Sequence, residues 1–227
     1  MKYVSAIIVA GGSGSRMGTK TKKQYLKIHN KEILAHTVEC FNSMPEIQEI
    51  IVVTGKEDIQ YVDKLLKQHY KFDKVKSIVE GGRERQDSVY NGIKQADSQA
   101  EYLIIHDGAR PLITKEVILK GLDKAYEHKA SIVAVPVKDT IKIINSDGKV
   151  ETTPKRDTLW SVQTPQTFEK KLILEAYKEA YEKHIQATDD SMLVEALGVP
   201  VYIVEGEYTN IKITTPEDLI MAENILK

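Results

Sequence analysis

The 227-residue sequence contains a single cysteine, Cys40, so no disulfide can form within the chain. Its six histidines are scattered, and no pair of them has the spacing of a zinc site. The 32 basic residues are matched by 33 acidic ones. Without a basic excess to neutralise a phosphate backbone, we expect no nucleic-acid partner. No apolar run approaches the ~18 residues of a membrane span, so we expect no membrane partner either.

The first apolar stretch, residues 3–10, is about as long as a short signal-peptide core. It follows only one lysine, lacks a clear cleavage site and leads directly into glycines. We therefore interpret it as a buried strand, and we expect a cytoplasmic protein. A composition of 41% hydrophobic and 29% charged residues is typical of a globular protein with a sizeable core.

Strand and helix patterns alternate along most of the chain. Further strands are expected at residues 24–28, 49–54, 77–80, 101–106, 131–136, 158–163, 200–204 and 210–213, and helices at 33–41, 56–70, 87–96, 114–128, 169–183, 191–197 and from 215 onwards. Most of these strands are continuously apolar and need cover on both faces. The pattern therefore predicts an α/β protein with a Rossmann-like, mainly parallel sheet and helices on both of its faces. No repeat or linker interrupts it, so we expect one domain over residues 1–227.

Residues 137–157 break this alternation. Asp147-Gly148 lies between two alternating runs, and this dipeptide favours a β-hairpin. A two-stranded hairpin has little core of its own, so we expect a protruding β-arm that packs on something else, such as a second subunit.

The glycine-rich stretch at residues 10–17 is the first candidate site. Glycines allow tight turns and let backbone N–H groups approach an anion closely. Arg16 and Lys23 place positive charge within reach of the same anion. The stretch matches neither the Walker loop nor the full dinucleotide fingerprint, so a structural turn and a nucleoside triphosphate site both remain open.

A second glycine turn, Gly81-Gly82, follows the strand expected at 77–80. One interpretation is a turn in which Asp87 or Ser88 caps the next helix. The other is a wall for a nucleotide base, read by backbone groups and by Ser88.

Asp107 follows the strand at 101–106 and has Arg110 close by in the sequence. A carboxylate at a strand end suits an oxygen-preferring cation such as Mg²⁺, and Asp107 is our candidate metal ligand. The alternative is a structural Asp107–Arg110 ion pair. We expect His106 to be structural, because its side chain should point to the opposite face of the strand.

Four other positions are less specific. Lys212 lies in an apolar stretch where an unpartnered ammonium is costly, which favours a ligand-facing role. Thr188 precedes two aspartates and could simply begin a helix. Thr140 and Arg156 lie at the two ends of the arm, where a solvated surface hairpin is the simpler interpretation.

Taken together, the motifs resemble the 2-C-methyl-D-erythritol 4-phosphate cytidylyltransferase family over essentially the whole chain. Individually each motif is weak, but eight of them in this order are highly specific. The motifs are Ala-Gly-Gly-x-Gly-x-Arg-Met at 10–17, Lys-Gln-Tyr-Leu at 23–26, Gly-Gly-x-Glu-Arg-x-Asp-Ser-Val at 81–89, His-Asp-x-Ala-Arg-Pro at 106–111, Pro-Val-x-Asp-Thr at 136–140, Leu-Trp-x-x-x-Thr-Pro-Gln at 159–166, Thr-Asp-Asp at 188–190 and Asn-Ile-Lys-Ile-Thr-x-Pro-Glu-Asp-Leu at 210–219.

The resemblance implies a cytidylyl transfer from CTP to a polyol phosphate, with a divalent cation such as Mg²⁺ on Asp107. It implies catalytic roles for Arg16, Lys23, Arg156 and Lys212. It further implies that substrate is bound by Ala10, Gly11, Gly12, Gly14, Gly82, Arg83, Ser88, Arg110, Thr140 and Thr188. In that family the arm crosses to the partner of a homodimer, so Arg110, Thr140 and Arg156 are expected to serve the neighbouring site.

The sequence departs from the family pattern at three positions. Lys22 replaces a usual proline, Gly108 replaces a usual alanine, and Arg83 occupies a variable position. Two alternatives stay open: the related ribitol-5-phosphate cytidylyltransferase, and a regulatory protein that binds nucleotide without turnover. Leu159-Trp160 and the Ala109-Arg110-Pro111 ending look more like the methylerythritol enzyme.

Overall fold

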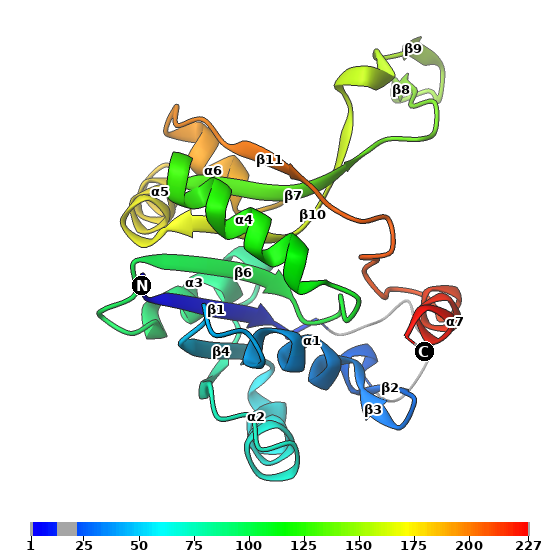
Figure 1. The fold of residues 1–227 in the computed structure, drawn as a ribbon. Helices are drawn as coiled ribbons and strands as arrows, with labels where there is room; N and C mark the ends of the chain where they lie inside the picture. The colour runs from blue at the N-terminus through cyan, green and yellow to red at the C-terminus, as the bar shows by residue number, and fades with distance from the viewer. Residues whose placement is uncertain (1, 13–21, 227) are drawn as a thin grey trace.

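The computed structural model describes residues 2–12 and 22–226, arranged around a seven-stranded sheet (Figure 1). The strand order is β11-β7-β10-β6-β1-β4-β5. The strands are β1 (Val4–Val9), β4 (Glu49–Thr54), β5 (Val75–Glu80), β6 (Tyr102–Asp107), β7 (Ala130–Pro136), β10 (Trp160–Glu169) and β11 (Tyr202–Glu205). Strand β10 is antiparallel to both neighbours, and the other pairings are parallel. The predicted α/β class with a mainly parallel sheet is confirmed.

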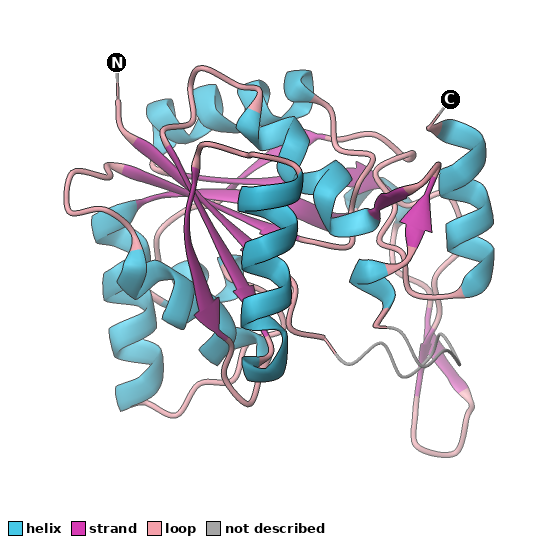
Figure 2. Cartoon of the chain, turned by 90° about the horizontal axis from the view of Figure 1, so that it is seen from below, coloured by secondary structure: helices cyan, strands magenta, loops and turns pink. Residues whose placement is uncertain are grey.

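Helices cover both faces of this sheet, as Figure 2 shows. Along β1, Ile8 faces one apolar cluster and Ile7 faces the other, because successive strand side chains point to opposite faces. The first cluster receives α1 (Ile33–Asn42), α2 (Ile59–Asp63) and α4 (Lys115–His128). The second receives α3 (Arg85–Gln95), α5 (Lys170–Glu182) and α6 (Ser191–Ala196). Double-sided burial therefore explains the continuously apolar strands.

A smaller layer closes one end of the sheet. Helix α7 (Pro216–Ile225) begins with Thr215 as N-cap and Pro216 in the first turn, as the sequence predicted. It packs on the short hairpin of β2 (Lys27–Ile28) and β3 (Lys31–Glu32) through a third apolar cluster. Within the described ranges, no helix combines the length and apolarity that crossing a bilayer would require.

Three expected elements were wrong in detail. Residues 210–213 form no strand, because they lie over the end of β6: Ile213 N donates to Ala109 O at 2.9 Å, and no neighbouring strand pairs with them. The strand expected at 24–28 is a 3-10 turn, η2 (Lys23–Tyr25), followed by β2. The helix expected at 56–70 is divided into 3-10, α and π segments.

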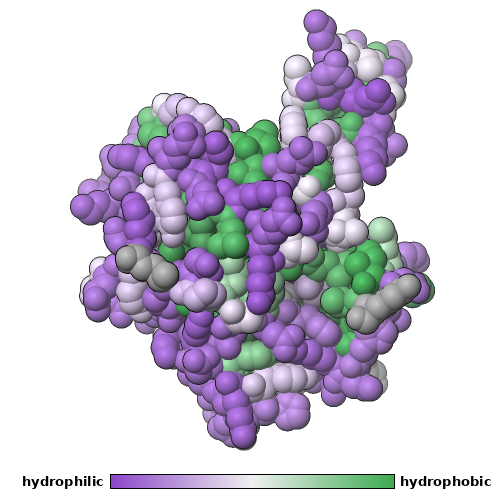
Figure 3. All heavy atoms as spheres, viewed as in Figure 1, coloured by the Kyte–Doolittle hydropathy of each residue, from purple (hydrophilic) through white to green (hydrophobic). Residues whose placement is uncertain are grey.

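The hairpin expected within residues 137–157 is present. It consists of β8 (Ile143–Ile144) and β9 (Val150–Thr152), and Gly148 takes the left-handed conformation at φ 79° that the turn requires. The hairpin stands clear of the sheet and helices in the space-filling view (Figure 3). Its apolar side chains Ile143, Ile144 and Val150 are 46%, 59% and 58% exposed.

Candidate active site

The carboxyl ends of β1, β5 and β6 meet at one edge of the sheet. Gly108 N donates to Val9 O at 2.8 Å, which ties the end of β6 to the end of β1. Gly81 N donates to Thr54 O at 2.8 Å, which ties the second glycine turn to β4. The polar residues that follow these strands are thereby brought together, as expected for ligand sites in parallel sheets.

A cavity of about 390 Å³ opens at this edge. It is lined by most of the predicted site residues, namely Ala10, Gly11, Gly12, Lys23, Gly82, Arg83, Ser88, Asp107 and Lys212. The predicted residues Gly14 and Arg16 lie outside the described ranges. Sequence positions separated by as many as 200 residues therefore line one cleft.

Gly82 is required by close packing at the second glycine turn. A Cβ at this position would lie 2.1 Å from Cβ of Asp87, so any other residue would displace the helix start. Ser88 Oγ accepts from Gly82 N and donates to Glu84 O, both at 3.0 Å. Helix α3 begins with a capping box between Glu84 and Asp87. The second glycine turn is therefore held by hydrogen bonds and close packing, and its residues Gly82 and Ser88 also line the cavity.

Asp107 lies at the centre of the positive charge in this cleft. It is 7% exposed, and its carboxylate is 2.8 Å from Lys212 Nζ. The guanidinium Nε atoms of Arg110 and Arg85 lie 3.6 and 3.7 Å away. Burial alone would raise the pKa of Asp107, but these three cations outweigh it and hold the pKa well below its usual range. Asp107 is therefore ionised at neutral pH.

The Lys212 ammonium is not unpartnered in its apolar stretch, because it pairs with the Asp107 carboxylate. Its side chain is 39% exposed, and its ammonium binds Asp107 while lining the cavity. Lys23 is anchored next to Lys212 in the sequence, because its Nζ donates to Ile213 O at 2.9 Å. Both lysines line the first cavity.

A second cavity of about 260 Å³ adjoins the first. Arg85, Asp107 and Lys212 line both cavities. The second cavity also holds Arg110 and Thr188, two of the residues expected to contact the second substrate. Two ligand spaces therefore meet where the positive charge is concentrated.

Arg85 is a site residue that the sequence reasoning missed. Its guanidinium donates to Asp190 Oδ2 at 2.8 Å as well as facing Asp107. Asp190 is buried and also accepts from Tyr177 OH at 2.6 Å. The helix was expected from residue 87, whereas α3 begins at Arg85, and this earlier start turns Arg85 into the cleft. Its place as the matched arginine of the motif at 81–89 was the signal that could have identified it.

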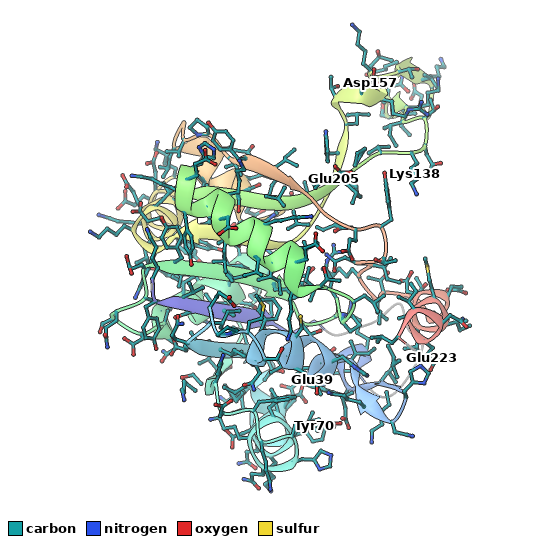
Figure 4. The ribbon with its side chains drawn as sticks, viewed as in Figure 1. Glu39, Tyr70, Lys138, Asp157, Glu205 and Glu223 are labelled. Atoms are coloured by element: carbon teal, nitrogen blue, oxygen red, sulfur yellow. The ribbon has the colours of Figure 1, made fainter. Side chains whose placement is uncertain are left out.

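Thr140 and Arg156 lie away from this cleft in the same chain. Arg156 Nη1 donates to Lys138 O at 3.1 Å within the arm, and both predicted residues are exposed. Figure 4 shows Asp157, the neighbour of Arg156, on the arm and clear of the sheet. Neither residue lines the two cavities described above.

His106 is structural, as predicted. It is fully buried, with Nδ1 3.1 Å from Thr164 Oγ1 and Nε2 3.2 Å from Arg110 O. Thr164 Oγ1 also accepts from Asp107 N at 3.0 Å, so its hydroxyl proton is available to His106 Nδ1. This network assigns the neutral tautomer with the proton on Nε2, and burial lowers the pKa of His106 to about 4.

We expect this histidine to make the fold acid-sensitive. The unfolded chain takes up the proton near pH 6.5, whereas folded His106 resists it down to about 4, so lowering the pH through this window favours unfolding. The free energy of unfolding in metal-free buffer should fall by about 3 kcal/mol between pH 6.5 and 4 from this group. Urea titrations of wild type and His106→Asn test this, and an equally steep pH dependence in the variant would contradict it.

The oxygen donors of the cleft fit a magnesium ion. Asp107 is an ionised carboxylate, and Gln24, a residue of the cavity wall, has a buried side-chain oxygen without a hydrogen bond. Magnesium commonly takes one or two protein oxygens and completes its shell with water and substrate phosphates. No group of three or more His, Cys, Asp or Glu side chains suited to a metal occurs in the described ranges.

An open α/β sheet with a cleft of glycine turns and cations at its carboxyl edge is typical of a nucleotide-binding enzyme. The family model for 2-C-methyl-D-erythritol 4-phosphate cytidylyltransferase matches residues 4–227. A protein of that name from Alkaliphilus oremlandii is 55% identical over 98% of this chain and 94% of its own length. One from Caldanaerobacter subterraneus is 49% identical, over 99% of each chain.

A solved structure agrees with these sequences. The 4-diphosphocytidyl-2C-methyl-D-erythritol synthase of Anaerococcus prevotii superposes with a TM-score of 0.88 at 38% identity, covering 99% of this chain and 98% of its own. The chain belongs to the 2-C-methyl-D-erythritol 4-phosphate cytidylyltransferase family. It is accordingly an enzyme of the nucleotidyltransferase class, as the motifs predicted.

Proposed function

We propose that this chain transfers the cytidylyl group of CTP to 2-C-methyl-D-erythritol 4-phosphate, giving 4-diphosphocytidyl-2-C-methyl-D-erythritol and diphosphate. Membership of the family over residues 4–227 is the observation that carries the proposal. The reaction would supply a step of non-mevalonate isoprenoid precursor synthesis. The matched relatives favour neither ribitol 5-phosphate as acceptor nor a protein without turnover.

The chemistry requires positioning and charge rather than a general base. A phosphate monoester has a second pKa near 6, so the attacking group is already largely dianionic at neutral pH. The obstacle is the approach of one polyanion to another, which cations held in place can relieve. Lys23 in the first cavity and Lys212, which lines both cavities, are suited to this need, and Arg110 and Thr188 are suited to hold the acceptor.

The remaining roles follow the family resemblance. Arg16 would join Lys23 at the α-phosphate and the departing diphosphate, and Gly82, Arg83 and Ser88 would form the cytosine pocket. The backbone of Ala10, Gly11, Gly12 and Gly14 would line the triphosphate. Asp107 would hold a magnesium ion, which when bound supplies charge neutralisation at the phosphates.

Diphosphate release from CTP tests the proposal. The assay compares methylerythritol phosphate, ribitol 5-phosphate and no acceptor, each with magnesium present. We expect release with the first acceptor only. Preference for ribitol phosphate would assign the chain to the related enzyme, and no release with either would favour the regulatory alternative.

The arm supports a homodimer in this proposal. Its exposed isoleucines and valine need a partner surface, and Arg156 lines neither of the two cavities of its own chain. We propose that Thr140 and Arg156 of each arm complete the acceptor site of the other protomer. Arg110 was expected to serve the neighbouring site as well, but in this chain it lines the second cavity beside Lys212.

Arg156→Ala should mainly weaken the acceptor. Loss of one charge-assisted hydrogen bond to a phosphate should raise the KM for methylerythritol phosphate about 10- to 100-fold, with little change in the KM for CTP. Steady-state kinetics with each substrate varied in turn measure both constants. A change confined to the CTP constant would overturn the assignment.

Mixed dimers test whether the arm acts across the interface. A protomer with Lys23→Ala has a dead site but an intact arm, and a protomer with Arg156→Ala has the reverse. Random mixing should restore about a quarter of wild-type activity at low acceptor concentration, because half of the dimers would contain one complete site. If the arm served its own chain, mixing would restore nothing.

A further inference from the structure

Residues 22–25 are fastened to the fold by every one of their side chains. Lys22 binds Asp58 at 2.6 Å and also pairs with Glu57, both in the segment after β4. The other three contacts are Lys23 Nζ to Ile213 O at 2.9 Å, Gln24 Nε2 to Ala10 O at 2.7 Å, and Tyr25 OH to Thr54 Oγ1 at 2.8 Å. Four consecutive side chains thus bind four different segments of the fold.

The Lys22–Asp58 pair is better placed than an ordinary surface ion pair. The two side chains are 26% and 16% exposed, and Asp58 Oδ2 also accepts from Tyr25 OH at 3.0 Å. Burial alone would lower the pKa of Lys22, but hydrogen bonds to Asp58 and Glu57 outweigh it and raise the pKa. Both members of the pair are therefore charged, and Asp58 also binds Tyr25, which lies two residues after Lys23. Isolated, exposed ion pairs contribute little to stability, whereas this pair is partly buried and part of a network.

The Lys22–Asp58 pair belongs to a hydrogen-bond network that leads to the Gly81-Gly82 turn, which is proposed to line the cytosine pocket. Asp58 holds Tyr25, Tyr25 OH lies 2.8 Å from Thr54 Oγ1, and Thr54 O accepts from Gly81 N at 2.8 Å. The network therefore runs from the residue before Lys23 to the turn that contains Gly82.

The backbone of Lys22 has φ −60° and ψ 138°. A proline ring imposes a φ of about −65°, so proline is compatible with this position. A lysine at this position does not fix φ by itself. The backbone of Lys22 is therefore restrained by the ion pair that its side chain makes with Asp58. Proline therefore offers a way to restore the backbone restraint without the charge.

We infer that Lys22 is a positioning residue, whose ion pair with Asp58 fixes residues 22–25 and thereby orients Lys23 toward the phosphates of the nucleotide. The inference rests on the proposed role of Lys23 and adds a residue to it. Lys22 acts through the backbone and contacts no reacting group. Its contribution should appear in turnover, where the geometry of Lys23 matters most.

Lys22→Ala is the first test. A displacement of about 1 Å in a catalytic group can cost up to ~100-fold, so we expect kcat to fall about tenfold while the KM for each substrate changes less than threefold. Lys22→Arg should retain the pair and most of the activity. Lys22→Pro should recover at least half of the lost kcat by fixing φ, which a purely electrostatic effect on substrate would not allow.

Two further variants identify the partner. Asp58→Asn should reproduce the fall in kcat, and combining it with Lys22→Ala should cause little additional loss, since both remove one interaction. Lys27→Ala is the matched control, because Lys27 is another ion-paired lysine nearby in the chain whose pair with Glu32 lies outside the cleft. It should leave kcat unchanged.

Wild-type kcat in Lys22→Ala would overturn the inference. A loss that neither Lys22→Arg nor Lys22→Pro recovers, accompanied by a lower Tm, would also overturn it and leave only a stabilising role. Lys23→Ala is measured in parallel. If Lys23→Ala is inactive and Lys22→Ala is normal, only this inference fails; if Lys23→Ala is itself fully active, the proposed catalytic role fails.

Discussion

Replacing Lys23 with alanine is expected to lower kcat by about 30- to 1000-fold, which corresponds to about 2–4 kcal/mol of lost transition-state stabilisation. The ammonium lies at the edge of the nucleotide cavity, anchored on Ile213 O at 2.9 Å. Negative charge moves onto the diphosphate as the bond to the α-phosphorus breaks, so a fixed cation is worth more in the transition state than in the bound substrate. CTP affinity should therefore change far less than kcat.

Steady-state kinetics, together with calorimetric titration of CTP, separate these two effects. Lys23→Arg retains the charge but changes its geometry, and it should lose part of the activity because an ammonium and a guanidinium are not interchangeable at a fixed site. An unchanged kcat in Lys23→Ala would exclude the role. A loss confined to CTP binding would make Lys23 a binding residue only.

The sequence predicted the sheet and its edge because both follow from local patterns. Continuously apolar runs identified the buried strands, and Asp107 was placed at a strand end by its position after such a run. Helices were expected from residues 114 and 215, and Thr114 and Thr215 cap α4 and α7 by accepting backbone hydrogen bonds, which is local chemistry.

The sequence could not predict the exact ends of the helices and strands or the contacts between residues far apart in the chain. Residues 210–213 have a strand-like composition, yet they cross the end of β6 and bond to Ala109 instead of a strand. Arg85 was not named as a site residue, because its pairing with Asp107 and Asp190 depends on contacts between residues far apart in the sequence. The partner of Lys212, found 105 residues earlier at Asp107, follows from the fold alone.

Asp107→Asn is expected to lower kcat by about 100-fold, comparable with the loss of a key electrostatic group. Asparagine preserves the shape of the side chain but removes its charge. The variant should also require at least about tenfold more magnesium for half-maximal activity, because a neutral amide is a weaker ligand than a carboxylate for this hard cation. Activity measured against magnesium concentration tests both points.

The structural alternative, in which Asp107 only neutralises its neighbours, predicts a different pattern. Removing the carboxylate leaves Lys212, Arg85 and Arg110 without their shared counter-ion, and breaking a buried pair on one side typically costs about 3–5 kcal/mol. Thermal unfolding should therefore show a lower Tm that added sulfate restores more in Asp107→Asn than in wild type. If stability falls but the magnesium requirement does not move, Asp107 is a counter-ion and the metal must be held elsewhere. If both change, the carboxylate has two roles: it balances three cations before CTP binds and is available to a metal cation once CTP binds.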